Sequence, residues 1–153
     1  MKITISKIPE QGMSVEGTEP PELLTMEPGA EFRAAGPLIC DLYVQVLDGA
    51  LLVRGTVSAS MEARCARCTQ IFSTTVGDSG FLRDYSDILE MEEVDISEDL
   101  RETIILSLPH FPLCDEGCKG LCAHCGKDLN EGPCGCPDGN ENGAWEALDN
   151  LSL

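Results

Sequence analysis

The segment LICDLYVQVLDGALLVRGTVSAS, residues 38–60, has the residue pattern of an antiparallel β-hairpin. Apolar side chains recur at every second position on both sides of Asp48-Gly49, so that one face of each strand is apolar. An Asp-Gly pair between two such runs is typical of a tight two-residue turn, because both central positions of that turn need positive φ. The pattern therefore predicts two strands joined at this turn. Cys40 falls on the apolar face of the first strand, where we expect it to be a small core residue.

The alternation continues beyond the hairpin toward the C-terminus. The return strand runs through residues 61–64 into Cys65 and Cys68, and residues 71–76 have the pattern of a further strand. This order predicts an antiparallel meander with a Cys-x2-Cys turn at one hairpin tip.

The region before the hairpin is patterned more weakly. Residues 2–7 alternate, which predicts a short strand with Ile3 and Ile5 on one face. Residues 9–37 hold five of the nine prolines. We expect an irregular loop there, with one short strand near Leu23–Met26.

The hydrophobic period changes at residue 95. Apolar side chains then recur at every fourth position, at Ile96, Leu100, Ile104 and Leu108. Pro109 ends this run, which predicts one amphipathic helix over about 97–108, with Asp95 or Ser97 as its cap. A second, shorter helix is predicted near the end of the chain, where Trp145, Leu148 and Leu151 share one face.

The residues between the strands and the helix are acidic and lack a clear period. Residues 77–113 hold ten acidic and two basic side chains. For residues 77–94 we expect a solvated loop, and the alternative is a docking surface for a basic partner.

These patterns predict an α+β protein. We expect a mainly antiparallel β-sheet or open barrel, one long amphipathic helix and a C-terminal zinc-ribbon-like segment. The predicted organisation is a β-rich domain over residues 1–113 and a cysteine-rich zinc-binding segment with a short C-terminal helix over residues 114–153.

Composition limits the classes of function. The chain of 153 residues has 10 basic and 27 acidic side chains, and its formal net charge is −17. A protein binds nucleic acids and anionic membranes through a basic surface, so this negative charge argues against simple electrostatic binding to either. No apolar run approaches the roughly 20 residues that cross a bilayer, and the N-terminus lacks the pattern of a signal peptide. We therefore expect an acidic, cytoplasmic protein without membrane contact.

Nine cysteines in such a chain need a chemical reason. Disulfides are disfavoured in a reducing compartment, and an odd number of cysteines cannot pair completely. Eight of the nine form spaced groups, which are Cys65-x2-Cys68, Cys114-x3-Cys118-x3-Cys122-x2-Cys125 and Cys134-x-Cys136. Close pairs of this kind on tight turns are typical of structural Zn²⁺ sites with four thiolate ligands.

The spacing also indicates which thiols share an ion. Cys122 and Cys125 are followed one short hairpin later by Cys134 and Cys136, which predicts one ribbon-like site. By elimination the second site takes Cys65, Cys68, Cys114 and Cys118. An interleaved arrangement, in which Cys65 and Cys68 face Cys122 and Cys125, is the alternative. Residues 109–144 offer few large apolar side chains, so the energy of metal binding would replace that of a core.

Other readings of the cysteines are weaker. The spacing of Cys118, Cys122 and Cys125 matches that of radical-SAM enzymes, but only 28 residues follow it. A thioredoxin-like role for Cys65 and Cys68 lacks a surrounding βαβ pattern. Catalytic zinc needs an open position, and two full sets of four thiolates leave none. We therefore expect the zinc to be structural, and we expect no small-molecule substrate.

Several other polar residues lie near the cysteines. His110 is expected in a turn, and His124 is expected to point away from the ion. Four basic side chains flank the cysteines, Arg64, Arg67, Lys119 and Lys127. They can offset the charge of the zinc–thiolate centres, and they are the candidates for a direct RNA-phosphate contact.

A set of motifs runs from about residue 38 to the end of the chain. They are Gly55-Thr56-Val57, Cys65-Ala66-Arg67-Cys68, Leu106-Ser107-Leu108-Pro109, Pro112-Leu113-Cys114, the string CKGLCAHCGKDLN at 118–130, Cys134-Gly135-Cys136, and Trp145 with Leu148. Together they resemble the YceD-like family, the large ribosomal RNA subunit accumulation proteins. The string at 118–130 is the most specific of them, and it departs from the family pattern at Ala123, where a proline is common.

The resemblance implies a protein of ribosome biogenesis that supports rRNA accumulation and has no catalytic activity. It also implies that the C-terminal cysteine cluster is an addition, since some members lack it. With the acidic composition, we expect a non-enzymatic factor with two structural Zn²⁺ ions that works through a basic ribosomal protein or assembly factor. The alternative is a thiol redox or metal-handling protein that uses Cys65 and Cys68.

Overall fold

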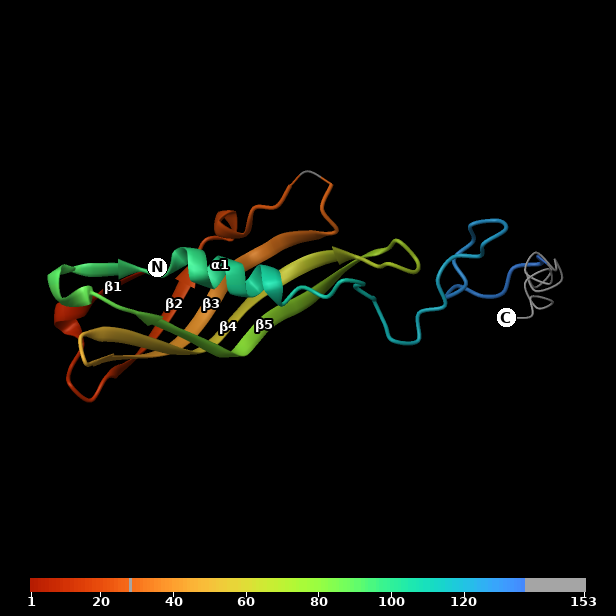
Figure 1. Ribbon diagram of the computed structural model, residues 1–153. Helices are drawn as coiled ribbons and strands as arrows, with labels where there is room; N and C mark the ends of the chain where they lie inside the picture. The colour runs from red at the N-terminus through yellow and green to blue at the C-terminus, as the bar shows by residue number, and fades with distance from the viewer. Residues whose placement is uncertain (28, 137–153) are drawn as a thin grey trace, which may run out of the picture.

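The fold is an elongated antiparallel β-sheet with one helix across its face and a cysteine-rich extension at one end (Figure 1). The structure is a computed structural model that describes residues 1–27 and 29–136. In chain order the elements are β1 (Lys2–Thr4), β2 (Met13–Glu19), β3 (Phe32–Leu47), β4 (Ala50–Arg64), β5 (Ile71–Tyr85), β6 (Glu93–Asp95) and α1 (Ser97–Leu106). Short 3-10 turns span Ile5–Lys7, Pro21–Leu24 and Ile88–Glu90.

The main sheet has four strands in the order β2-β3-β4-β5, each antiparallel to its neighbours. β3 and β4 form the predicted hairpin, with Val44 opposite Val53. Its turn is at Asp48 (φ 50°) and Gly49 (φ 81°), which are the two positive φ angles that the Asp-Gly pair predicts. The prediction of a mainly antiparallel sheet with one helix is confirmed for the described residues, and the sheet is open rather than closed into a barrel.

The core lies between one face of this sheet and α1. The largest fully buried side chains of the sheet include Leu38, Leu42, Leu51, Met61 and Phe81. The helix contributes Leu100 and Ile104, which are both fully buried, and Ile96 directly before it. Cys40 is 1% exposed within the same core, as predicted.

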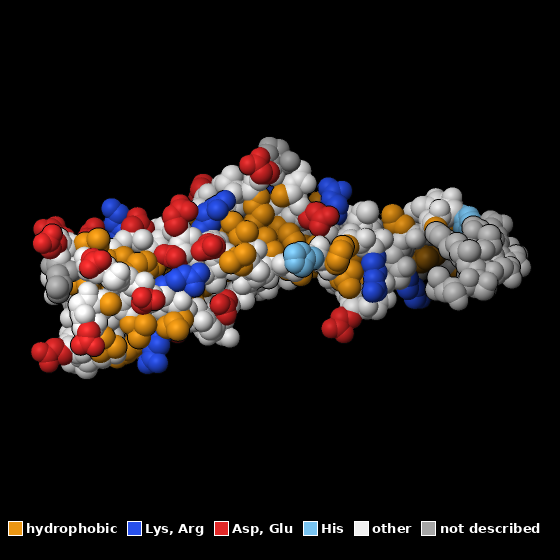
Figure 2. Space-filling model, viewed as in Figure 1, with side chains coloured by type: hydrophobic (Ala, Val, Ile, Leu, Met, Phe, Trp, Pro, Cys, Tyr) orange, Lys and Arg blue, Asp and Glu red, His pale blue; other side chains and the backbone are white. Residues whose placement is uncertain are grey.

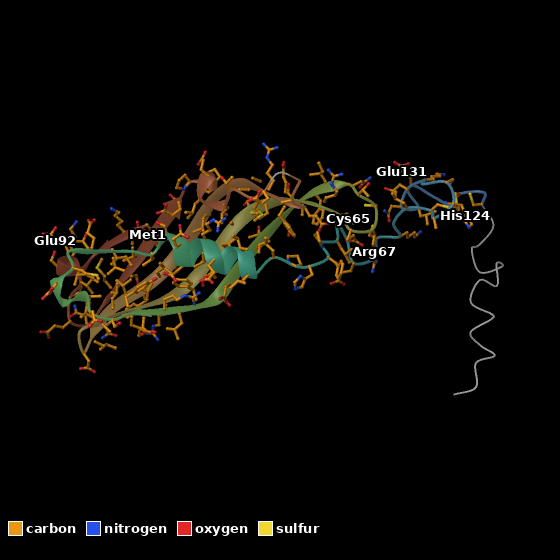
Figure 3. The ribbon with its side chains drawn as sticks, turned by 45° about the horizontal axis from the view of Figure 1, so that its top comes forward. Met1, Cys65, Arg67, Glu92, His124 and Glu131 are labelled. Carbon is orange, nitrogen blue, oxygen red and sulfur yellow. The ribbon has the colours of Figure 1, made fainter. Side chains whose placement is uncertain are left out.

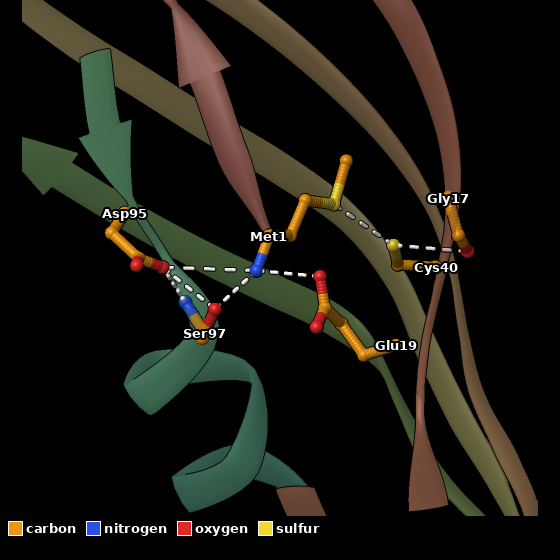
Figure 4. Close-up of polar contacts among 6 residues, drawn as sticks. All are labelled: Met1, Gly17, Glu19, Cys40, Asp95 and Ser97. Atoms are coloured by element: carbon orange, nitrogen blue, oxygen red, sulfur yellow. Dashed lines mark hydrogen bonds and ion pairs between the residues drawn. The ribbon is translucent and has the colours of Figure 1, made fainter.

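A two-stranded sheet of β1 and β6 closes the core beside the helix, with Ile3 opposite Val94. At this point the Met1 amine contacts Ser97 and forms ion pairs with Glu19 (2.5 Å) and Asp95 (3.7 Å) (Figure 4). These contacts tie the small sheet to β2 and to the start of α1.

Polar contacts between two residues of β5 and one residue of α1 hold the helix on the sheet. The Tyr85 hydroxyl donates to Asp99 Oδ2 at 2.5 Å, and Arg83 Nε donates to Asp99 Oδ1 at 3.2 Å. Burial and the Asp99 carboxylate raise the pKa of Tyr85 above its ordinary value. Since Asp99 lies in the first turn of the helix, its charge also interacts favourably with the helix dipole.

The weakly patterned regions differ from the sequence-based expectation. Residues 9–37 are not an irregular loop, because β2 occupies Met13–Glu19 and β3 already begins at Phe32. The strand predicted near Leu23–Met26 is instead a 3-10 turn over Pro21–Leu24. β2 is an edge strand with no fully buried side chain, so its alternation in the sequence is faint.

The acidic stretch also has more structure than the predicted loop over 77–94. β5 continues to Tyr85, and β6 follows at Glu93–Asp95. The register of β4 and β5 shifts between Gly55 and Val57, and this bulge interrupts the period of two that the sequence would otherwise show. The helix is confirmed over Ser97–Leu106, two residues shorter than the predicted 97–108. The helix predicted around Trp145 lies outside the described residues.

Candidate metal centres

Four cysteines from two distant segments meet at the end of the main sheet. Cys65 and Cys68 lie in the turn between β4 and β5, and Cys114 and Cys118 lie in the segment that follows α1. Their sulfur atoms all lie within 4.8 Å of one another. Cys65 Sγ is 3.8 Å from Cys118 Sγ, and Cys68 Sγ is 3.6 Å from Cys114 Sγ. We call this set the sheet-end cluster.

These separations fit a four-thiolate metal ion. A tetrahedral Zn²⁺ with Zn–S bonds of about 2.3 Å places its sulfur atoms about 3.8 Å apart. A disulfide would need about 2.05 Å. If an ion were bound, four thiols could fill all four positions of a tetrahedron, which is the ligand set of structural rather than catalytic zinc sites.

The backbone of the turn between β4 and β5 places the thiols of Cys65 and Cys68 close together. Cys65 N–H donates to the Gln70 carbonyl at 2.8 Å, and Thr69 N–H donates to the Cys65 carbonyl at 2.9 Å. Arg67 N–H points at Cys65 Sγ across 3.5 Å. Thr69 has a positive φ of 62°, which lets the chain turn back into β5. The backbone thus presents both thiols on one side of the turn.

The sheet-end cluster is sheltered from water. Cys65 is 1%, Cys68 2% and Cys118 5% exposed, and Phe72 and Leu113 pack against them. Burial opposes the ionisation of Cys65, but N–H groups including those of Cys114 and Cys68 lower the pKa of its thiol to about 6. Burial and the thiol of Cys68 raise the pKa of Cys114 to about 12. The lowered pKa of Cys65 favours its thiolate, the form that binds a cation, whereas Cys114 must release a proton to do so.

A second set lies farther along the extension. The sulfur atoms of Cys122, Cys125, Cys134 and Cys136 also all lie within 4.8 Å of one another, and we call this set the ribbon cluster. Cys122 N–H donates to the Lys127 carbonyl at 2.8 Å, Gly126 N–H donates to the Cys122 carbonyl at 2.9 Å, and His124 N–H points at Cys122 Sγ across 3.4 Å. Gly126 has a φ of 73°, the conformation that favours glycine at the end of such a turn.

The ribbon cluster has the same electrostatic pattern with more exposure. The N–H groups of Cys125 and His124 lower the pKa of Cys122 to about 6. The thiol of Cys125, together with burial, raises the pKa of Cys136 to about 12. Cys125 is exposed, whereas every thiol of the sheet-end cluster is at least half-buried.

The structure therefore brings the eight predicted thiols into the two sets of four that their spacing indicated, and not into the interleaved arrangement. Their role as metal ligands stays a prediction. His124 and His110 are exposed and belong to neither set. Cys65 and Arg67 lie together at the sheet end, and His124 lies out along the extension (Figure 3).

The four predicted basic residues have different surroundings. Arg67 Nη1 donates to the carbonyls of Cys118 (2.9 Å) and Glu116 (3.2 Å), so it braces the sheet-end cluster. Lys127 Nζ donates to the Pro133 carbonyl at 3.1 Å and holds the ribbon cluster together. All four residues are exposed, and no such hydrogen bond is seen for the side chains of Arg64 and Lys119 among the described residues. At least half of the predicted basic spot thus has a bracing role.

One residue that the sequence did not single out lies between the two clusters. Asn130 Nδ2 donates to Cys118 Sγ at 3.3 Å, although Asn130 follows the first cysteine pair of the ribbon cluster. An asparagine in a loop has many ordinary roles, so its residue type gave no distinctive signal.

An open antiparallel sheet with two clusters of four cysteines defines a class, that of small β-rich proteins with sites suited to structural metal ions. A family model described as "Large ribosomal RNA subunit accumulation protein YceD" matches residues 77–152. This range contains the whole ribbon cluster and the two later thiols of the sheet-end cluster. Together with the relatives described next, this match supports the assignment of the chain to the YceD-like family that the resemblance of its motifs predicted.

Two curated relatives from plants carry the name of this family, and a bacterial relative covers more of the chain. The chloroplastic large ribosomal RNA subunit accumulation protein YCED homolog 1 of Arabidopsis thaliana is 36% identical over 62 residues, which are 40% of this chain and 19% of that protein. Its counterpart in Zea mays is 40% identical over 53 residues, 34% of this chain and 18% of that protein. An uncharacterized protein of Mycobacterium leprae is 26% identical over 144 residues, 85% of this chain and 63% of that protein.

The chain thus spans less than two thirds of the length of these relatives. No solved structure matches it. Among the described residues, no helix has the length and apolar character that a membrane crossing requires.

Proposed function

We propose that this protein is a non-enzymatic, cytoplasmic, zinc-binding factor that supports the accumulation of large-subunit ribosomal RNA. The observation that carries the proposal is the family match over residues 77–152, which begins within β5 and includes α1 and the cysteine-rich extension. The family description names large-subunit rRNA accumulation. The two clusters supply the chemistry of two structural Zn²⁺ ions, one held by Cys65, Cys68, Cys114 and Cys118, the other by Cys122, Cys125, Cys134 and Cys136.

The metal would act on the fold. The sheet-end cluster would join the tip of the β4–β5 hairpin to the segment after α1, and the ribbon cluster would hold a segment that has few large apolar side chains. Structural Zn²⁺ in small domains contributes on the order of 10 kcal/mol of folding free energy. Such a contribution would make the extension a rigid zinc-ribbon-like unit at the end of the sheet.

The partner that we propose is a basic ribosomal protein or assembly factor. Figure 2 shows acidic side chains spread over the β-sheet body on the face in view. Glu90, Glu92 and Glu93 are exposed beside one another between β5 and α1. Two zinc–tetrathiolate centres would add about −4 to the formal charge. Electrostatic attraction therefore favours a basic protein over RNA, whose phosphates would be repelled.

Neighbouring acidic residues of this region are occupied within the fold. The Asp95 carboxylate accepts the N–H (3.0 Å) and the hydroxyl (2.6 Å) of Ser97 at the start of α1, and these hydrogen bonds lower the pKa of Asp95. Asp99 accepts from Tyr85 and Arg83. A charge-neutralising variant that leaves the fold intact should thus change only Glu90, Glu92 and Glu93 to glutamine.

The function is tested in cells that lack the protein. The ratio of large-subunit to small-subunit rRNA should fall, and re-expression of the wild-type chain should restore it. A Cys65→Ser/Cys118→Ser chain should restore it poorly. An unchanged ratio in the depleted cells would refute the proposal. The partner is tested by capture of ribosomal proteins on the purified chain, and equal capture by the Glu90/Glu92/Glu93 glutamine variant would refute the acidic docking surface.

The thiol redox or metal-handling alternative makes a different prediction. Cys65 and Cys68 would then work as an isolated pair, but in the structure their sulfur atoms face those of Cys118 and Cys114 across 3.8 and 3.6 Å. Tightly held zinc supports the structural role. A metal-free chain with a reducible Cys65–Cys68 bond would support the redox role.

A further inference from the structure

The ribbon cluster sits on a small hairpin that begins directly after the last thiol of the sheet-end cluster. Leu121 pairs with Asp128 across this hairpin, and Leu129 N–H donates to the Gly120 carbonyl at 2.9 Å. Cys122 and Cys125 lie toward the tip of the hairpin, and Asn130 lies at its base. We therefore expect that metal binding, by ordering the tip of the hairpin, also fixes the position of Asn130 at its base.

The side chain of Asn130 is held in one orientation. Its Oδ1 accepts the N–H of Lys119 at 2.8 Å, so its amide nitrogen must face the other way. That nitrogen donates to Cys118 Sγ at 3.3 Å and to Asp128 Oδ1 at 2.8 Å. The donor next to the sulfur is thus fixed by the network, not by the choice of amide rotamer.

The base of the hairpin is also fastened to the tip of the main sheet. Leu121 N–H donates to the Arg67 carbonyl at 3.1 Å, and Gln70 Nε2 donates to Asp128 Oδ2 at 3.1 Å. Gly120, with a φ of 74°, allows this close approach, because a side chain there would lie 3.0 Å from the Arg67 carbonyl oxygen. The hairpin and the β4–β5 turn therefore form one connected unit around Cys118.

A donor to the Cys118 sulfur matters because the residue is only 5% exposed and so has little access to water. A hydrogen bond to a buried thiolate stabilises its negative charge and the bond that it makes to a metal ion. Partners of this kind typically change metal affinity by about 10–100-fold.

We propose that Asn130 is a positioning residue that couples the two clusters, so that metal in the ribbon cluster stabilises metal in the sheet-end cluster. The inference rests on the proposed metal binding. When the ribbon cluster is filled, its hairpin is ordered and the Asn130 amide stays on Cys118. When it is empty, the hairpin loosens and the sheet-end thiolate loses its donor.

The test follows zinc release from the full-length chain to a chromophoric chelator. In the wild-type chain two zinc ions should leave, and mapping of the cysteines that become open to alkylation shows which cluster each ion leaves. The rate that tests the inference is release of the sheet-end ion from chains whose ribbon cluster is still filled, and Asn130→Ala should speed it by about tenfold or more. Glu131→Gln is the matched control, since Glu131 is exposed and adjacent, and it should behave as wild type.

Asn130→Asp separates the role at sulfur from a merely structural role. Aspartate keeps the acceptor for the Lys119 N–H but has no donor for Cys118 Sγ. If Asn130 acts on the sulfur, release from Asn130→Asp should be at least as fast as from Asn130→Ala. If Asn130 only shapes the loop, Asn130→Asp should release the sheet-end ion as slowly as the wild-type chain does. That result would overturn the proposal.

The coupling is tested with Cys134→Ser/Cys136→Ser, which removes the ribbon ion. This change should speed release of the sheet-end ion in the wild-type background and have little further effect in Asn130→Ala. If Cys134→Ser/Cys136→Ser speeds release equally in the wild-type and Asn130→Ala backgrounds, the proposed coupling is overturned. If the wild-type chain holds no zinc at all, the proposed function fails. If it holds two and Asn130→Ala releases them as wild type does, only this inference fails.

Discussion

The sulfur atoms of Cys65 and Cys118 lie 3.8 Å apart, although 53 positions separate the two residues in the sequence. The first directly follows the long β4 strand, and the second lies in a segment without regular secondary structure beyond α1. A metal ion between them would close the loop that contains β5, β6 and the helix. The stability of the sheet end should therefore depend on the metal.

Loss of one sheet-end thiol should remove one metal ion and destabilise the fold. Cys68→Ser replaces a ligand that is 2% exposed, so we expect the zinc content to fall from two to one and the free energy of unfolding to fall by about 3 kcal/mol or more. Denaturant unfolding with parallel metal analysis measures both. Cys40→Ser removes a buried thiol outside the clusters and should keep two zinc ions. Equal zinc loss in both variants would contradict this assignment.

Metal affinity should rise with pH. Cys114 and Cys136 each have a pKa raised to about 12, so these thiols hold their protons at pH 7 when no metal is bound. Zinc must displace these protons, whereas Cys65 and Cys122, with pKa values near 6, are already largely ionised. Lowering the pH from 8 to 6 should thus weaken binding by about tenfold or more per unit. Competition titrations with a chelator measure this slope, and a flat profile would contradict it.

Gly55 should not tolerate a side chain. A Cβ at this position would lie 2.1 Å from the Asp41 carbonyl oxygen, and its φ is +153°. We expect Gly55→Ala to lower the free energy of unfolding by about 3 kcal/mol, as measured by denaturant unfolding. Gly36→Ala is the control, because the nearest atom to its Cβ would be Ser60 Cβ at 3.6 Å. It should change stability by less than about 0.5 kcal/mol.

The Tyr85–Asp99 contact should make stability depend on alkaline pH. Burial and the Asp99 carboxylate raise the pKa of Tyr85, so the folded state favours the protonated phenol. This contribution is fully present below the unfolded-state pKa of about 10 and is lost as the pH rises above it. Tyr85→Phe should cost about 1 kcal/mol at pH 7 and flatten the loss of stability above pH 10. Thermal unfolding between pH 7 and 11 tests this, and identical curves for the two chains would contradict it.

The parts of the fold that the sequence predicted well have strong local signals. The hairpin around Asp48-Gly49 combines alternation on both strands with a turn that needs positive φ. The helix is marked by a period of four and by Pro109. The grouping of cysteines follows from short spacings, because a Cys-x2-Cys turn can present both thiols to one ion only through a narrow set of backbone conformations.

The parts of the fold and of the candidate site that the sequence did not predict depend on tertiary contacts. β2 is an edge strand whose side chains are half-buried at most, so its apolar positions are not distinctive. The second half of β5 contains a register shift between Asp78 and Phe81, which breaks its alternation. Asn130 gains its place only when the ribbon hairpin is docked on the β4–β5 turn, and no local pattern encodes that contact.

The central claim is that both clusters hold zinc, and native mass spectrometry of the chain purified without added metal tests it most directly. The account predicts a mass that corresponds to two zinc ions per chain. When the zinc is removed, the eight thiols of the two clusters should become reactive to alkylation. A metal-free chain with a Cys65–Cys68 disulfide would contradict it.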